Sequence, residues 1–337
     1  MTVLVTGGAG YIGSHAALAL LDAGRHVVVL DNLSQGHRWA VPAGAAFVEG
    51  DCGDYELVRK LITDHDVTAI MHFAGSIIVP ESVVYPLDYY YNNTVNSRAL
   101  AQAAVDAGIR HFIFSSTAGV YGEPAKTPIL EDFPSKPISP YGTSKMMTEK
   151  MLADASVAHD MNYVALRYFN VAGADPKGRA GQTSRKATHL IKIASQAATG
   201  VRSHLEIYGE DYETPDGTCI RDYIHVSDLA NAHVLALEYL ENGGESDVMN
   251  CGYGRGFSVK EVISAVKEVS GVDFPVKLAE RRPGDPAALI AGADRVREKL
   301  GWVPKHDDLE MIVRHALDWE ESLKKRPLRA SGSEGSK

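Results

Sequence analysis

The sequence VLVTGGAGYIG, residues 3–13, places a short β-rich run directly before a glycine-rich turn and the start of a helix. Gly7, Gly10 and Gly13 recur at every third position. In a dinucleotide-binding turn, one glycine permits the tight bend, one lets backbone N–H groups approach a pyrophosphate, and one lets the helix pack close to the strand. This stretch therefore predicts a dinucleotide-binding unit at the start of the chain.

Asp31 indicates which dinucleotide the turn binds. It ends the second apolar run, 18 positions after Gly13. A carboxylate at this place accepts a hydrogen bond from the 2′-OH of the adenosine ribose and would repel a 2′-phosphate. The pattern predicts NAD, not NADP, as the cofactor.

Short apolar runs alternate with helix-like segments through the first half of the chain. Such alternation is typical of a parallel sheet with helices on both faces. We predict an α/β fold, a Rossmann-like doubly wound parallel sheet with a smaller C-terminal substrate-binding lobe. The strands are expected at residues 3–6, 27–30, 47–48, 69–73, 112–115 and 163–167, and the helices at 13–23, 55–64, 92–107 and 140–158.

The pattern becomes irregular after about Gly173. We predict an NAD-binding domain over residues 1–174, with 222–240 packing back on it, and a substrate-binding lobe over 175–325. Helices are expected in this half near 187–199, 229–239, 259–269 and 309–325. The polar end of the chain, residues 326–337, reads as a disordered tail.

Composition excludes several function classes. The chain has 337 residues, 34 Lys and Arg against 43 Asp and Glu, and a net charge of -9, which disfavours a nucleic-acid-binding protein. Its 3 cysteines are far apart and its 13 histidines lack metal-site spacing, so no bound metal is expected. No apolar run is long enough to span a membrane, and no secretory signal is recognisable, so we expect a cytoplasmic protein.

Tyr141 and Lys145 stand four residues apart in a predicted helix and so share one face. They follow a strand whose exit carries the hydroxyls of Ser115, Ser116 and Thr117. A free tyrosine has a pKa of about 10 and is a poor base, but a nearby ammonium and a nicotinamide cation would lower that pKa. The combination predicts proton transfer by Tyr141 beside hydride transfer, with Thr117 holding the substrate oxygen.

With these features the chain resembles the extended short-chain dehydrogenases/reductases, and within them the UDP-sugar 4-epimerases, from Thr2 to about Leu323. The resemblance is carried by VTGGAGYIGSH, VVVLDNLS, FVEGD, HFAG, YYNNT, FIFSSTAGVYGE, SPYGTSKMMTE, LRYFNVAGADP, GTCIRDYIHVSDLA and ERRPGD. It implies that UDP-glucose and UDP-galactose are interconverted with NAD that stays bound. Hydride leaves the sugar C4, the 4-keto sugar rotates about its diphosphate, and hydride returns to the other face.

The resemblance also assigns residues by position. Tyr141 is implied as the base, Lys145 as the group that lowers its pKa, and Thr117 as the catalytic hydroxyl. The cofactor-binding residues expected are Gly7, Gly10, Tyr11, Ile12, Gly13, Asp31, Asn32, Asp51, Cys52, Phe73, Ala74, Gly75, Asn93, Ser115, Tyr141, Lys145 and Tyr168. The substrate-binding residues expected are Thr117, Tyr141, Asn170, His189, Tyr208, Arg221, Arg282 and Asp285. A homodimer through the helices at 92–107 and 141–158 is also implied.

The chain departs from the family pattern at several positions, and the departure at Leu289 leaves the acceptance of N-acetylated sugars open. Thr117 replaces a common Ser, His189 replaces an Asn that contacts the nucleotide, and Leu289 stands where residue size governs acceptance of a 2-N-acetyl group. The alternatives are a 4-epimerase of UDP-N-acetylhexosamines or UDP-pentoses, a UDP-glucuronate decarboxylase, and a non-catalytic dinucleotide-binding regulator. A 4,6-dehydratase is disfavoured because Ala118 and Gly119 follow Thr117 where those enzymes have an Asp-Glu pair.

Overall fold

A computed structural model describes residues 1–183, 188–282 and 284–325 of the chain. Its centre is a seven-stranded sheet in the order β11-β6-β5-β4-β1-β2-β3, in which every neighbouring pair is parallel. The strands are β1 (Thr2–Thr6), β2 (His26–Asp31), β3 (Ala46–Glu49), β4 (Val67–His72), β5 (His111–Thr117), β6 (Asn162–Tyr168) and β11 (Asp247–Cys251). The predicted Rossmann-like fold is confirmed.

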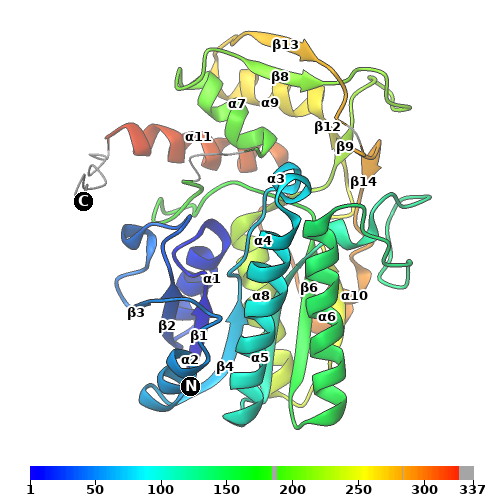
Figure 1. Ribbon diagram of the computed structural model, residues 1–337. Coiled ribbons are helices and arrows are strands. Elements are labelled where there is room, and N and C mark those ends of the chain that lie inside the picture. The colour runs from blue at the N-terminus through cyan, green and yellow to red at the C-terminus, as the bar shows by residue number, and fades with distance from the viewer. Residues whose placement is uncertain (184–187, 283, 326–337) are drawn as a thin grey trace, which may run out of the picture.

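The sheet is buried on both faces, as its nearly continuous apolar strands require. Within β1, Val3 and Val5 belong to one hydrophobic core and Leu4 to the other, since successive side chains point to opposite faces. Helices α1 (Tyr11–Asp22) and α8 (Val226–Glu241) pack together over the first core. Helices α2 (Tyr55–Asp64), α5 (Asn96–Asp106) and α6 (Pro140–Ala158) cover the second (Figure 1).

The helix predicted at 92–107 has a different start in the structure. Two short helices, α3 (Val79–Val84) and α4 (Pro86–Tyr90), lead into a π-helical turn over Tyr91–Val95, and α5 begins only at Asn96. A π-helical turn adds a residue to the helical turn and often marks a functional site. Here it turns the Asn93 side chain inward, where that residue is 2% exposed.

The second half of the chain supplies a lobe above the carboxyl ends of the strands (Figure 1). Helices α7 (Leu190–Ala198), α9 (Val259–Ser270) and α11 (Leu309–Lys325) pack together there. Strand β8 (Leu205–Tyr208) pairs with β13 (Val276–Ala279), and β9 (Ile220–Arg221) lies between β12 (Phe257–Ser258) and β14 (Ala288–Leu289). The remaining elements are β7 (Asn170–Ala172), β10 (Tyr223–His225) and α10 (Asp294–Leu300).

The boundary between the two parts is interleaved. Helix α8 packs against α1, β5 and β6, all within residues 1–174. Strand β11 comes from the range expected to form the lobe, yet it pairs with β6 in the main sheet. The division at residue 174 stays a prediction, and the tail predicted at 326–337 lies outside the described residues.

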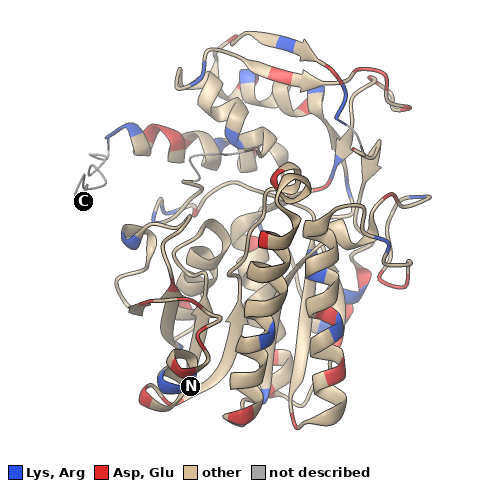
Figure 2. Ribbon diagram, viewed as in Figure 1, with Lys and Arg blue, Asp and Glu red and all other residues tan. Residues whose placement is uncertain are grey.

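Both positively and negatively charged residues occur along the outer helices α5 and α6 (Figure 2). No helix in the described ranges is long and apolar enough to cross a membrane. The same ranges contain no cluster of three or more His, Cys, Asp or Glu side chains arranged to hold a metal ion.

Candidate active site

The glycine turn between β1 and α1 is shaped by close backbone contacts. Gly7 has a φ of +72°, and a Cβ atom there would lie 2.6 Å from the Ala74 nitrogen. Only glycine meets both constraints without strain. Helix α1 starts after Gly10, and no side chain caps it. The backbone N–H groups of its first turn therefore have no hydrogen-bond acceptor within the helix. This donor set fits a pyrophosphate.

Asp31 lies against this turn and is 8% exposed. Its Oδ2 accepts a hydrogen bond from the Ala9 N–H at 2.9 Å, and its Oδ1 accepts one from the Leu33 N–H at 2.8 Å. Each carboxylate oxygen keeps a free lone pair. The carboxylate is therefore held rigidly at the edge of the turn and can still accept from ribose hydroxyls.

A second group of hydrogen-bonded polar residues lies where strands β2 and β3 end. The Asn32 amide donates to Asp51 Oδ2 at 3.0 Å, and the Asn96 amide donates to Asp51 Oδ1 at 3.0 Å. Neighbouring Cys52 is 7% exposed, and burial raises the pKa of its thiol to about 12, so it stays protonated. The predicted residues Asn32 and Asp51 thus lie together, beside the carboxyl ends of β2 and β3.

Tyr141 stands in the first turn of α6 and is 8% exposed. Burial raises the pKa of its phenol, and a hydrogen bond with the Thr117 side chain opposes that rise. The sequence predicted that Lys145 and a nicotinamide cation beside the phenol would lower the pKa of Tyr141. In the protein alone, desolvation outweighs the favourable contacts because it disfavours the phenolate.

Lys145 lies one turn further along α6 and is 3% exposed. Its ammonium donates to the Ser115 carbonyl at 3.0 Å and lies 4.9 Å from the centre of the Phe114 ring. Burial lowers the pKa of Lys145 to about 8. The Ser115 hydroxyl bonds to the Tyr168 hydroxyl, so four predicted residues, Thr117 included, gather where β5 and β6 end.

Asn93 is positioned by residues that the sequence did not single out. Its Oδ1 accepts from the Ser76 N–H at 2.7 Å, and its Nδ2 donates to Ser144 Oγ at 3.1 Å. The Ser144 hydroxyl donates to the Tyr141 carbonyl at 2.7 Å. Ser144 lies between Tyr141 and Lys145 in the sequence, so the same motif could have indicated it. The end of β4 is also close, because Gly75 approaches the Asn93 side chain.

Other predicted cofactor residues have structural contacts of their own. The Tyr11 hydroxyl donates to the Gly173 carbonyl at 2.7 Å, which ties the glycine turn to the chain beyond β7. The Phe73 ring lies 4.7 Å from the His233 ring of α8. Tyr11 and Phe73 are half-buried and pack against the hydrophobic core that α1 and α8 cover.

The lobe presents two arginines, each already paired. Arg221 forms an ion pair with Asp285 and is 7% exposed. The Arg282 guanidinium lies 3.8 Å from the centre of the Tyr208 ring. Guanidinium groups suit phosphate recognition because they donate hydrogen bonds in a fixed planar fork. The four predicted lobe residues therefore form two local pairs that can present cations to a diphosphate.

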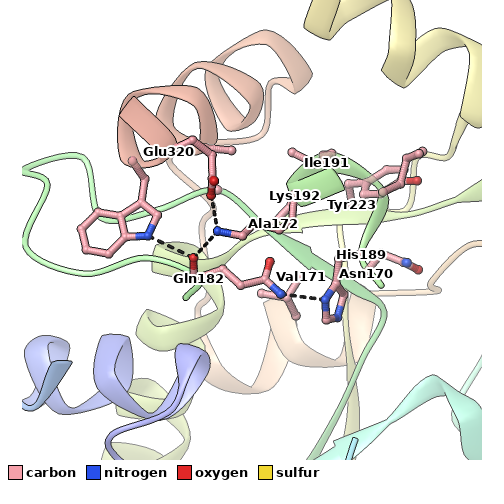
Figure 3. Close-up of a pocket in the computed structure, with 13 residues that line it drawn as sticks. Asn170, Val171, Ala172, Gln182, His189, Ile191, Lys192, Tyr223 and Glu320 are labelled. Carbon is pink, nitrogen blue, oxygen red and sulfur yellow. Dashed lines mark hydrogen bonds and ion pairs between the residues drawn. The ribbon is translucent and has the colours of Figure 1, made fainter. Parts of the chain in front are cut away.

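Asn170 and His189 line a small pocket between β7, α7 and α11 (Figure 3). The Gln182 amide and His189 Nδ1 are 2.8 Å apart. Behind them Lys192 is buried in an ion pair with Glu320, and its ammonium also donates to the Gln182 carbonyl at 2.6 Å. Burial lowers the pKa of His189, so this imidazole is neutral at neutral pH.

Comparison with known proteins identifies relatives over nearly the whole chain. The profile of the NAD dependent epimerase/dehydratase family matches residues 3–252. A UDP-glucose 4-epimerase of Azospirillum brasilense is 62% identical over 334 residues, covering 99% of this chain and 96% of the relative. The solved structure of UDP-glucose 4-epimerase from Brucella ovis in complex with NAD is 47% identical, with a TM-score of 0.91 over 94% of this chain and 97% of its own. The UDP-Glc/GlcNAc 4-epimerase of Campylobacter jejuni is 50% identical, with a TM-score of 0.83 over 95% of this chain and 99% of its own.

Proposed function

This chain belongs to the NAD dependent epimerase/dehydratase family, and we propose that it interconverts UDP-glucose and UDP-galactose by inverting C4 of the sugar. NAD is its cofactor, and the enzyme is an isomerase. The observation that carries the proposal is the meeting of Thr117, Tyr141 and Lys145 at the carboxyl edge of the sheet, the edge at which the glycine turn follows β1.

In the proposed mechanism, Tyr141 removes the proton of the sugar 4-OH, and the Thr117 hydroxyl holds that oxygen in place. When bound, NAD supplies a reversible hydride acceptor and, in its oxidised form, a positive charge that favours the phenolate. Lys145, whose ammonium donates to the Ser115 carbonyl, would hold the nicotinamide ribose. Asp31 accepts from the adenosine ribose.

Rotation of the 4-keto sugar requires that the uridine diphosphate stays bound while the hexose turns. Arg221 and Arg282 are the cations proposed to hold the diphosphate, with Asn170, His189, Tyr208 and Asp285 around them. Neither arginine lies in the hydrogen-bonded group around Tyr141. Anchoring the nucleotide in the lobe leaves the sugar free to present either face to the same phenol.

A second candidate substrate class is favoured by one position. Leu289 is half-buried in β14 and packs beside the short helix over Ala118–Tyr121 that follows Thr117. A leucine is smaller than a tyrosine at this place, and one relative acts on both UDP-Glc and UDP-GlcNAc. We therefore propose UDP-N-acetylhexosamines as additional substrates.

The predicted homodimer has support from surface composition. Exposed apolar side chains crowd α3, α4 and the π-helical turn, next to α5 and α6. They include Val83, Val84, Leu87, Tyr91 and Val95. An apolar patch of this kind marks a protein–protein contact, which sedimentation of the purified chain would test. The cytoplasmic location stays a prediction.

The direct test is incubation with a panel of UDP-sugars and no added reductant, followed by product identification by NMR. We expect UDP-glucose to give UDP-galactose, and the reverse. Denaturing release should yield NAD from the purified protein. Recovery of NADP, or C4-unchanged sugars throughout the panel, would overturn the proposal.

A further inference from the structure

Behind the catalytic end of strand β5 lies a buried ion pair that the proposed mechanism does not use. Glu149, on α6, and Arg167, on β6, have side chains that are 7% and 8% exposed and a closest contact of 2.6 Å. Arg167 Nε also donates to Glu149 Oε1 at 2.9 Å, which makes the pair bidentate. Burying two charges is costly, so a buried ion pair is weak evidence for stability, and another role for this pair is worth testing.

The carboxylate is bonded to the catalytic strand itself. Glu149 Oε1 accepts a hydrogen bond from the hydroxyl of Ser116, which is fully buried. Successive residues of a strand face opposite ways. Ser116 therefore faces α6, the side on which Phe114 and Lys145 also meet, whereas the Ser115 side chain faces the other way and bonds to Tyr168.

Arg167 extends the contact to the segment after the strand. Its Cα is the register partner of Ser116, and its guanidinium lies 4.8 Å from the centre of the Tyr121 ring. The Tyr121 hydroxyl donates to Asn250 Oδ1 at 2.7 Å. The ion pair thus joins α6, the ends of β5 and β6, and the short helix that follows Thr117.

Glu149 also follows Lys145 by one helical turn on α6, the spacing at which side chains are neighbours. The titratable groups around Lys145 come from three elements. Cys52 follows β3 with a thiol pKa of about 12, and His72 on β4 has its pKa lowered to about 3, so both are neutral at pH 7. Glu149 is the third, and its negative charge raises the pKa of Lys145 against the lowering effect of burial.

We propose that Glu149 is a positioning residue that fixes the end of β5 through Ser116 and supplies the negative charge that keeps Lys145 protonated. This inference rests on the proposed epimerase reaction, and it adds a residue that touches neither substrate nor cofactor. Glu149 thus has two proposed roles, a geometric one toward Ser116 and an electrostatic one toward Lys145, and different variants test each role.

The test is the pH dependence of kcat and KM for UDP-galactose in wild type, Glu149→Gln, Glu149→Asp and Ser116→Ala. Glu149→Gln keeps the size of the side chain and removes its charge. We expect the alkaline limb of its kcat profile, where Lys145 loses its proton, to move to lower pH by about one unit with KM unchanged. Glu149→Asp and Ser116→Ala keep the charge, so kcat should fall while the limb stays in place.

Glu241→Gln is the matched control, because Glu241 holds Arg25 in the same bidentate way, at 2.7 and 3.1 Å, at the opposite end of the sheet. It should leave the pH limb unmoved. A Glu149→Gln profile that superimposes on wild type, an equal shift in Glu241→Gln, or a shifted limb in Glu149→Asp would each overturn the inference. If Glu149→Gln does not fold, Glu149→Asp and Ser116→Ala still test the geometric role, and an unchanged kcat in both would overturn it. Failure of the wild type to epimerise would instead refute the proposed function.

Discussion

The carboxyl end of β5 and the two arginine pairs of the lobe hold their polar and charged side chains in different ways. At the end of β5, Lys145 and Thr117 are buried and bonded to neighbouring groups of the protein. In the lobe, Arg221 and Arg282 are occupied by Asp285 and Tyr208, which the diphosphate would have to replace or share.

This difference indicates where rigidity is needed. Proton transfer depends on donor and acceptor being held at hydrogen-bond distance, so preorganisation there raises the rate. In the proposed mechanism, the lobe would instead hold the diphosphate while the sugar turns. Arg221, which is buried, is paired with Asp285 in the absence of substrate, since an unpaired buried charge is costly.

Among the variants that test this comparison, the replacement of Tyr141 should change the activity most. Tyr141→Phe removes the proton acceptor and keeps the ring, so kcat should fall by about 10²- to 10⁴-fold while bound NAD is retained. Turnover and released NAD are the measurements. Tyr163→Phe, in a buried core tyrosine of β6, is the control and should keep activity. Substantial turnover in Tyr141→Phe would remove this residue as the base.

Replacing Arg282 should produce an intermediate effect of a different kind. Arg282→Met removes a cation that would contact the diphosphate, so KM should rise roughly tenfold to a hundredfold with kcat little changed. Arg281→Met is the matched control, because Arg281 lies over the Tyr212 ring at 3.9 Å in a similar stack. A fall in kcat with KM unchanged would place Arg282 with the catalytic group instead.

Changing Leu289 should produce the smallest effect, confined to substrate choice. Leu289→Tyr should lower kcat/KM for UDP-N-acetylglucosamine relative to UDP-glucose by about tenfold, because the larger ring takes the space of the N-acetyl group. Leu289→Ala, the opposite change, should favour the N-acetylated sugar. Equal effects of Leu289→Tyr on both sugars would show that this position does not select the substrate.

Much of the fold was predictable because its signals are local. The strand–glycine–helix order around Gly7 predicted the sheet, and the helices over Tyr55–Asp64 and Pro140–Ala158 have the predicted bounds. The helix at 92–107 was wrong at its start. Within the π-helical turn over Tyr91–Val95, Asn93 bonds to Ser76 and Ser144, which are distant in the sequence.

The sequence by itself determined the parallel sheet, the cofactor turn and the spacing of Tyr141 and Lys145, because each depends on residues within one or two elements. Tertiary structure decided the rest. It decided that β11 joins the main sheet, that Arg221 pairs with Asp285 and that Glu149 reaches both Ser116 and Arg167. These contacts join segments far apart in the chain, and burial sets their strength, so no local pattern could reveal them.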